Sequence, residues 1–252
     1  MEIFYLSGIF RCGNTLLRSI INQNPNFRVT PNSILPEVMF RLHLLKESVQ
    51  YKEWYKVDVD DKYKDHTKRY DNIIKNIFNN YYEGYNEEYI LDQGRWGTEY
   101  NFDMLKTYNF LPKKFIMLVR PLDEILKSWI RVNDIHKDHV ENHIDSLMKP
   151  DGQVGMGILA LENLLNNYSN HTLIVKYSDL CNYPESTIDR IYDFLGVPYF
   201  EHRFTNLNQV DGSTIHTRIK TDKIEVKDWN VSLPVNILEK YNYYYRLMES
   251  YG

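Results

Sequence analysis

The first 22 residues hold a short apolar run, a loop with two glycines and an amphipathic segment, in that order. Residues 3–6 are continuously apolar and precede Ser-Gly, which predicts a buried strand. In residues 14–22 leucine and isoleucine recur at helical spacing. Gly8 and Gly13 lie between these segments, where glycines let backbone N–H groups surround an anion and the helix adds its positive dipole end. This opening predicts a phosphate-binding loop at the end of a strand.

The residues around the second glycine differ from the loop of nucleoside triphosphatases, which continues with Lys and then Ser or Thr. Asn14 and Thr15 occupy those positions, so an amide replaces the lysine that would bind a γ-phosphate. A cation stands inside the loop instead, at Arg11. The pattern favours an anion site that differs from that of a triphosphatase.

A second cation follows the apolar run 114–119, which is typical of a strand buried on both faces in a parallel sheet. In triphosphatases such a strand ends in an acidic residue that helps to hold Mg²⁺, whereas here Arg120 follows it. An arginine at the carboxyl edge of a parallel sheet faces the crevice where ligands bind, and Ser128 lies about two turns into the next helical segment. The two junctions together predict a nucleotide with two separate anionic groups, and we expect no metal site.

Short apolar segments alternate with helical patterns along the chain. Further strands are expected near 89–91 and 173–177, and further helices at 34–45, 73–82, 157–165, 186–195 and 235–248. This alternation predicts an α/β fold of three layers, with a central, mostly parallel sheet flanked by helices. The length of 252 residues fits one domain over 1–252, in which the charged, Tyr-rich stretch around 46–70 is an insertion or a flap.

Composition argues against several kinds of partner and site. The net charge is −4 at pH 7, so the chain lacks the global basic field of a protein that binds nucleic acid or anionic membranes. Cys12 and Cys181 are the only cysteines, too few for a disulfide framework or a multi-cysteine zinc site. No apolar run approaches the roughly 20 residues of a membrane span, and no signal peptide is recognised. We therefore expect a cytoplasmic protein without a membrane span.

The motifs resemble those of the sulfotransferases that use 3′-phosphoadenosine-5′-phosphosulfate (PAPS), in the branch of bacterial and tyrosylprotein enzymes. SGIFRCGNTLLRSIINQNP is similar to the family's 5′-phosphosulfate loop, and LVRPLDEILKSW to its 3′-phosphate motif, in which an Arg and a Ser eight residues later bind the phosphate. The resemblance implies a P-loop-like fold that binds PAPS. It assigns Arg11, Cys12, Gly13, Asn14 and Thr15 to the loop, and Arg120 and Ser128 to the 3′-phosphate.

Two later segments extend the resemblance over most of the chain. LIVKYSDLCNYPESTIDRIYDFLGVP is similar to a family segment in which a Tyr lies near the nucleotide, here Tyr177. STIHTRIK, residues 213–220, resembles the basic C-terminal loop that covers the cofactor. That loop is expected around 205–228, with Arg218 and Lys220 as ligands.

The implied reaction is in-line transfer of a sulfuryl group from PAPS to a hydroxyl or amine acceptor, with adenosine 3′,5′-bisphosphate (PAP) as the leaving product and no metal required. Arg11 is expected to stabilise the charge on the leaving group. Acceptors in the family are small molecules, carbohydrates or peptides, and the sequence leaves both the acceptor and the oligomeric state open.

Other catalytic positions depart from the family pattern. A Glu of tyrosylprotein-type relatives corresponds to Asn32, so Glu37 is the candidate base, although a solvated helix carboxylate explains it equally well. The segment DQGRW resembles an Asp-Lys-x-Arg-x-Trp motif, with Gln93 in place of a lysine that assists transfer and Arg95 as the cation that could take over its role. His216, beside the expected cofactor loop, is a further acid–base candidate.

Two alternatives stay open on the residues alone. The first is an ATP-using P-loop enzyme such as a small-molecule kinase, which would need Mg²⁺ and a lysine or its equivalent where Asn14 stands. The second is a non-catalytic nucleotide-binding homologue, which is compatible with the departures at Asn14, Asn32 and Gln93.

Overall fold

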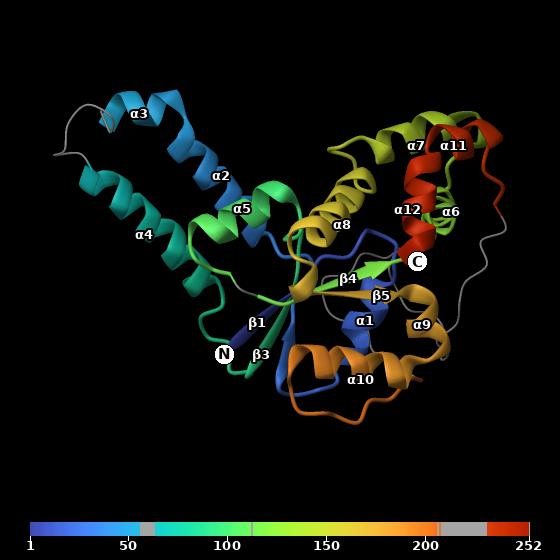
Figure 1. Ribbon diagram of the computed structural model, residues 1–252, viewed down its shortest axis with the longest axis horizontal. Coiled ribbons are helices and arrows are strands. Elements are labelled where there is room, and N and C mark those ends of the chain that lie inside the picture. Colours follow the sequence, from blue (N-terminus) through green and yellow to red (C-terminus); the bar gives the residue numbers. More distant parts are fainter. Residues whose placement is uncertain (56–63, 112, 206, 208–230, 252) are drawn as a thin grey trace.

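The computed structural model describes residues 1–55, 64–111, 113–205, 207 and 231–251 (Figure 1). This part of the chain contains one sheet of five strands, in the order β2-β3-β1-β4-β5, and every neighbouring pair is parallel. The strands are β1 (Glu2–Leu6), β2 (Phe27–Val29), β3 (Tyr89–Gln93), β4 (Phe115–Val119) and β5 (Thr172–Lys176). The α/β fold with a parallel central sheet is therefore confirmed.

Helices cover both faces of the sheet. Figure 1 shows α1 (Asn14–Ile21) and α10 (Pro184–Leu195) on one face, with α5 (Glu99–Thr107) and α8 (Gly155–Asn167) on the other. All residues of β3 and β4 are buried, because helices cover both faces of the sheet and leave no side chain of these strands facing solvent. This burial explains why β4 is a continuous apolar run in the sequence.

The order of the strands decides where the site can form. β1 pairs with β3 on one side and β4 on the other, and Leu6 at its end lies opposite both Gln93 and Ile116. The chain runs from β1 toward β2, whereas from β4 it runs toward β5, so the two connections diverge between β1 and β4. In open α/β sheets ligands bind outside the carboxyl ends of the strands at such a point.

Beyond the fourth strand the chain is mostly helical. The remaining helices are α6 (Leu122–Val132), α7 (Val140–Met148), α9 (Tyr177–Asn182), α11 (Val235–Lys240) and α12 (Asn242–Tyr251), with short 3₁₀ turns at Lys137–His139 and Ser169–His171. The single helix expected over 235–248 is wrong, because the chain breaks at Tyr241 and continues as α12 along α6. None of the described helices combines the length and the apolar character that a membrane crossing demands.

Three helices extend away from the sheet as an arm: α2 (Leu35–Glu47), α3 (Val49–Tyr55) and α4 (Lys64–Tyr81) (Figure 1). The stretch 51–70 shows no helical period in the sequence, yet its described residues, 51–55 and 64–70, are helical. Most of their side chains with a described burial face solvent, so no apolar stripe marks the helix. An ion pair between Arg69 and Asp65, one turn apart on α4, is typical of such an exposed helix.

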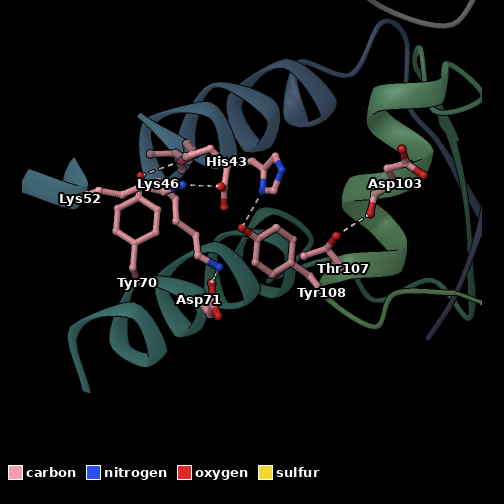
Figure 2. A network of polar contacts seen from close by, with 10 residues as sticks. His43, Lys46, Lys52, Tyr70, Asp71, Asp103, Thr107 and Tyr108 are labelled. Atoms are coloured by element: carbon pink, nitrogen blue, oxygen red, sulfur yellow. Dashed lines mark hydrogen bonds and ion pairs between the residues drawn. The ribbon is translucent and has the colours of Figure 1, made fainter. Parts of the chain in front are cut away.

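Polar contacts hold the helices of this arm together (Figure 2). Lys46 of α2 donates to Asp71 of α4 at 2.7 Å, and Tyr70 of α4 donates to the Leu42 carbonyl at 2.8 Å. His43 bonds through Nδ1 to the hydroxyl of Tyr108, at the end of α5, at 3.1 Å. The first two contacts join α2 to α4, and the third joins the arm to α5.

One buried carboxylate joins the ends of three elements. Asp92 of β3 accepts hydrogen bonds from the Thr30 hydroxyl after β2, the Tyr82 hydroxyl after α4 (2.7 Å) and the Trp96 indole N–H (3.0 Å). Burial raises the pKa of the Asp92 carboxyl above its ordinary value, and the hydrogen bonds that it accepts oppose the rise. Asp92 therefore supports the strand ends beside the expected site.

We predict that Asp92→Ala lowers the free energy of unfolding by about 3 kcal/mol or more, because three buried donors lose their acceptor at about 1–3 kcal/mol each. Asp92→Asn, which keeps an acceptor and removes the charge, should cost less than half as much. Urea denaturation measures both.

A comparison of the wild type with Asp92→Asn tests the raised pKa of Asp92. Since the folded pKa of Asp92 is raised, the unfolded chain releases the proton first, and wild-type stability should fall as pH rises from about 4 toward the folded pKa. Asp92→Asn should lack this component of the pH dependence. Equal costs for Ala and Asn, or identical pH profiles for wild type and Asn, would contradict the role given to Asp92.

Candidate active site

The loop between β1 and α1 has an unusual backbone at two positions. Arg11 has φ 71° and Gly13 has φ 97°, both in the left-handed region. The Cys12 N–H donates to the Ile9 carbonyl at 3.3 Å and tightens the turn. The Cys12 side chain is fully buried, and burial raises the pKa of its thiol, so this side chain packs in the core and leaves only its backbone near the loop surface.

The side chain of Asn14 links the two ends of this loop. Its Nδ2 donates to the Ile9 carbonyl at 3.0 Å, and a Cβ placed on Gly8 would lie 2.0 Å from its Oδ1. The side chain thus folds back across the loop, and Gly8 is needed for this close approach. Asn14 also begins α1, whose first N–H groups, including that of Thr15, have no partner within the helix.

The two arginines predicted at separate junctions lie together. Arg120, only 3% exposed, donates through a terminal nitrogen to the Arg11 carbonyl at 3.4 Å. Arg11 donates through Nε to the Ser128 hydroxyl at 3.0 Å. Burial, and secondly the charge of Arg120, lowers the pKa of Arg11. A pair of mutually repelling cations at a strand edge favours an anionic ligand.

Arg120 is held by two further contacts. Its Nε is 2.6 Å from Glu124 of α6, and its guanidinium carbon lies 4.2 Å from the ring centre of Tyr177, the first residue of α9. A Cβ on Gly13 would lie 2.5 Å from the same tyrosine ring. Tyr177 therefore contacts both the loop and Arg120, and the structure brings five of the predicted nucleotide residues into one cluster at the β1–β4 edge: Arg11, Gly13, Arg120, Ser128 and Tyr177.

A pocket of about 440 Å³ opens on the other side of the loop. Ser7, Gly8 and Phe10 of the loop form one wall, and the remaining walls come from residues 32–37, the end of β3, and the first turns of α5 and α8. Three predicted catalytic residues line it: Glu37, Gln93 and Arg95. The loop therefore separates the arginine cluster from a pocket large enough for a small ligand.

The charged residues of the pocket are exposed, whereas two of its amide side chains, Gln93 and Asn101, are buried. Glu37 is half exposed and pairs with Arg41 at 2.7 Å on α2, and Arg95 is also exposed. Gln93 is 8% exposed and donates to Asn32 Oδ1 at 3.0 Å. Two positions at which the family pattern expects charged residues therefore form a neutral pair.

Sequence reasoning missed two contributors to this region. Arg18 of α1 is buried and donates to the Thr15 hydroxyl and the Thr30 carbonyl, each at 3.4 Å, and burial lowers its pKa to about 10. Asn101 of α5 lines the pocket at 2% exposure. Arg18 lies four residues after Asn14, a spacing that places both on one face of a helix and could have pointed to Arg18. The sequence of α5 has no clear apolar periodicity, so no pattern points to Asn101. The predicted His216, Arg218 and Lys220 lie outside the described residues.

A model of the sulfotransferase family matches residues 4–201, which include the loop, both arginines and Tyr177. The chain belongs to the sulfotransferase family. Among curated proteins, none matches its sequence.

Solved sulfotransferases share its fold at low identity. The mouse sulfotransferase SULT7A1 complexed with PAP has a TM-score of 0.59 and 13% identity, covering 100% of this chain and 89% of that one. A sulfotransferase from Alicyclobacillus acidocaldarius has a TM-score of 0.55 and 12% identity, covering 99% and 93%. The sulfotransferase domain of the Synechococcus PCC 7002 olefin synthase has 0.52 and 19%, covering 79% and 74%.

Alanine substitutions at Gly13 and Gly84 test the close contact between the loop of this sulfotransferase and Tyr177. Gly13→Ala should lower the free energy of unfolding by about 1–2 kcal/mol for the left-handed φ and further for the contact with Tyr177. Gly84→Ala is the matched control, because Gly84 has φ 86° with no atom within 4 Å of the added Cβ. Chemical denaturation of both variants should show the larger loss at Gly13; equal losses would refute the close contact between loop and ring.

Proposed function

We propose that this sulfotransferase transfers the sulfuryl group of PAPS to a hydroxyl or amine acceptor bound in the 440 Å³ pocket. The observation that supports this most directly is the contact between the two cationic junctions, in which Arg11 reaches Ser128 at 3.0 Å and Arg120 reaches the Arg11 carbonyl at 3.4 Å. A ligand with two anionic groups fits one cluster with two guanidinium groups better than a single phosphate does. Family membership and the PAP complex of mouse SULT7A1 support the same nucleotide.

Each group of residues has a part in this proposal. The loop N–H groups of residues 13–15 and Arg11 bind the 5′-phosphosulfate, while Arg120 and Ser128 bind the 3′-phosphate and Tyr177 packs beside it. The acceptor oxygen or nitrogen forms its bond to sulfur as the bond from sulfur to the bridging phosphate oxygen breaks, and PAP leaves with that electron pair. Arg11 stabilises the developing charge, and Glu37 is the carboxylate in the pocket wall that takes the acceptor proton.

If Arg120 and Ser128 bind the 3′-phosphate, replacing either residue should weaken the preference of the protein for PAP over 5′-AMP. Wild-type protein should bind PAP at least tenfold more tightly than 5′-AMP, which lacks the 3′-phosphate, as seen by calorimetry and by thermal stabilisation. Ser128→Ala should reduce this ratio about threefold or more, and Arg120→Ala should bring it close to one. Because the ratio compares two ligands on one protein, it stays informative even if a variant is less stable.

Arg69→Ala is the matched control, since Arg69 also pairs with a carboxylate one turn away but lies on the exposed arm. It should leave the ratio unchanged. An Arg120→Ala ratio equal to wild type would refute the 3′-phosphate assignment, and stabilisation by Mg-ATP equal to or greater than that by PAP would favour the ATP-using alternative.

Catalysis is tested by following the transfer of a radioactive sulfuryl group from PAPS to an acceptor. Incubation with PAPS labelled with ³⁵S and a metabolite extract should yield a labelled product that contains the acceptor. Arg11→Ala should lower this rate by about 100-fold, the usual effect of removing one stabilising donor. Tight PAP binding without any labelled product would instead support the non-catalytic homologue.

A further inference from the structure

The guanidinium of Arg120 has an anionic partner within the protein itself. Its Nε donates to Oε2 of Glu124, in the first turn of α6, at 2.6 Å. The Arg120 side chain is 3% exposed and that of Glu124 is 31% exposed. Hydrogen bonds between ionised groups at such a distance are among the stronger ones in proteins. An anion that binds Arg120 therefore comes close to a carboxylate as well.

The contacts of Arg120 fix the orientation of its guanidinium group. The ring of Tyr177 lies against it at 4.2 Å, and a terminal nitrogen donates to the Arg11 carbonyl at 3.4 Å. The N–H donors of a guanidinium lie in one plane as a rigid fork, so the bond from Nε to Glu124 determines where the terminal nitrogens point. Five N–H donors allow one guanidinium to bind a carboxylate and a phosphate together. Glu124 thus orients Arg120 without taking the place of a ligand.

Glu124 also changes the charge of the arginine cluster. Arg11 and Arg120 carry two positive charges, and the carboxylate leaves a net charge of +1 on the three groups. Its field extends to the loop: burial raises the pKa of the Cys12 thiol, Arg120 opposes the rise and Glu124 adds to it. A phosphate beside Arg120 is therefore attracted by the two guanidinium groups and repelled by the carboxylate.

We propose that Glu124 is a positioning residue that orients Arg120, weakens its hold on the 3′-phosphate and thereby shortens the residence of PAP. This inference rests on the proposed function and deepens it. PAPS and PAP carry the same 3′-phosphate, so a stronger hold on this group would stabilise donor and product alike and would not favour the transfer step. It would delay the departure of PAP, and product release limits the turnover of many enzymes.

The test is Glu124→Gln, which removes the charge and keeps a side-chain oxygen that can accept from Arg120 Nε. Calorimetry should show that this variant binds PAP about fivefold more tightly than the wild type does. Its affinity for 5′-AMP, which lacks the 3′-phosphate, should stay within twofold. Surface plasmon resonance should show PAP dissociating about fivefold more slowly, because affinity changes within one interface arise mostly in dissociation. A selective gain in affinity cannot result from damage to the fold.

Two further variants separate charge from orientation. Glu124→Ala removes the charge and also the contact with Arg120, so its ratio of PAP to 5′-AMP affinity should be clearly below that of Glu124→Gln. Asp123→Asn is the matched control, because Asp123 lies on the same helix and pairs with Lys127 one turn away at 2.8 Å. It removes the same charge outside the cluster and should leave the ratio within twofold of the wild type.

The outcomes distinguish this inference from the proposed function. If the wild type does not bind PAP, the proposed function fails. If the wild type binds PAP but Glu124→Gln has an unchanged or lower ratio, only this inference is overturned. The same holds if Asp123→Asn raises the ratio as much as Glu124→Gln does, or if Glu124→Ala equals Glu124→Gln.

Discussion

The position of β1 in the sheet is the constraint on which the rest of the site depends. Because β1 lies between β3 and β4, the loop that leaves it has a neighbour on each side. On the β4 side the neighbouring connection brings Arg120 and Ser128 to Arg11. On the β3 side it brings Gln93 and a pocket. A group held by the loop therefore stands between an arginine cluster and a separate cavity, which is the arrangement that a transfer between two bound molecules requires.

Buried polar side chains keep this arrangement in register. Asn14 closes the loop on itself, and Asp92 holds the ends of the strands and helix beside the pocket. Arg18 connects the two regions, since it contacts Thr15 at the start of α1 and the Thr30 carbonyl beside the pocket. Placing a guanidinium in a site where burial depresses its pKa costs stability, so the position of Arg18 is explained by the connection and not by a gain in stability.

The sequence predicted those parts of the fold and site that follow from local pattern. The apolar run that became β4 and the glycines around Arg11 carry their own signal, and the rule that parallel strands present their carboxyl ends at one edge predicted that Arg11 and Arg120 would converge. β2 was missed because it has three residues, one of them the exposed Arg28. The helical parts of 51–70 lack an apolar stripe. The Asn32–Gln93 contact joins two segments distant in sequence, so no local pattern could reveal it.

The two sides of the loop differ in charge, and this difference has a physical consequence for selectivity. The overall charge of −4 conceals two neighbouring cations, Arg11 and Arg120, so under the proposed function an anionic nucleotide is attracted to this edge of the sheet. A charged pair in the pocket, a few residues from the same loop, would interact with that nucleotide and with the arginines at short range. Neutral amides avoid this coupling. Under the proposed function, affinity for the nucleotide then depends on the arginine cluster and contacts with the acceptor depend on the pocket wall, so the two are set by separate groups.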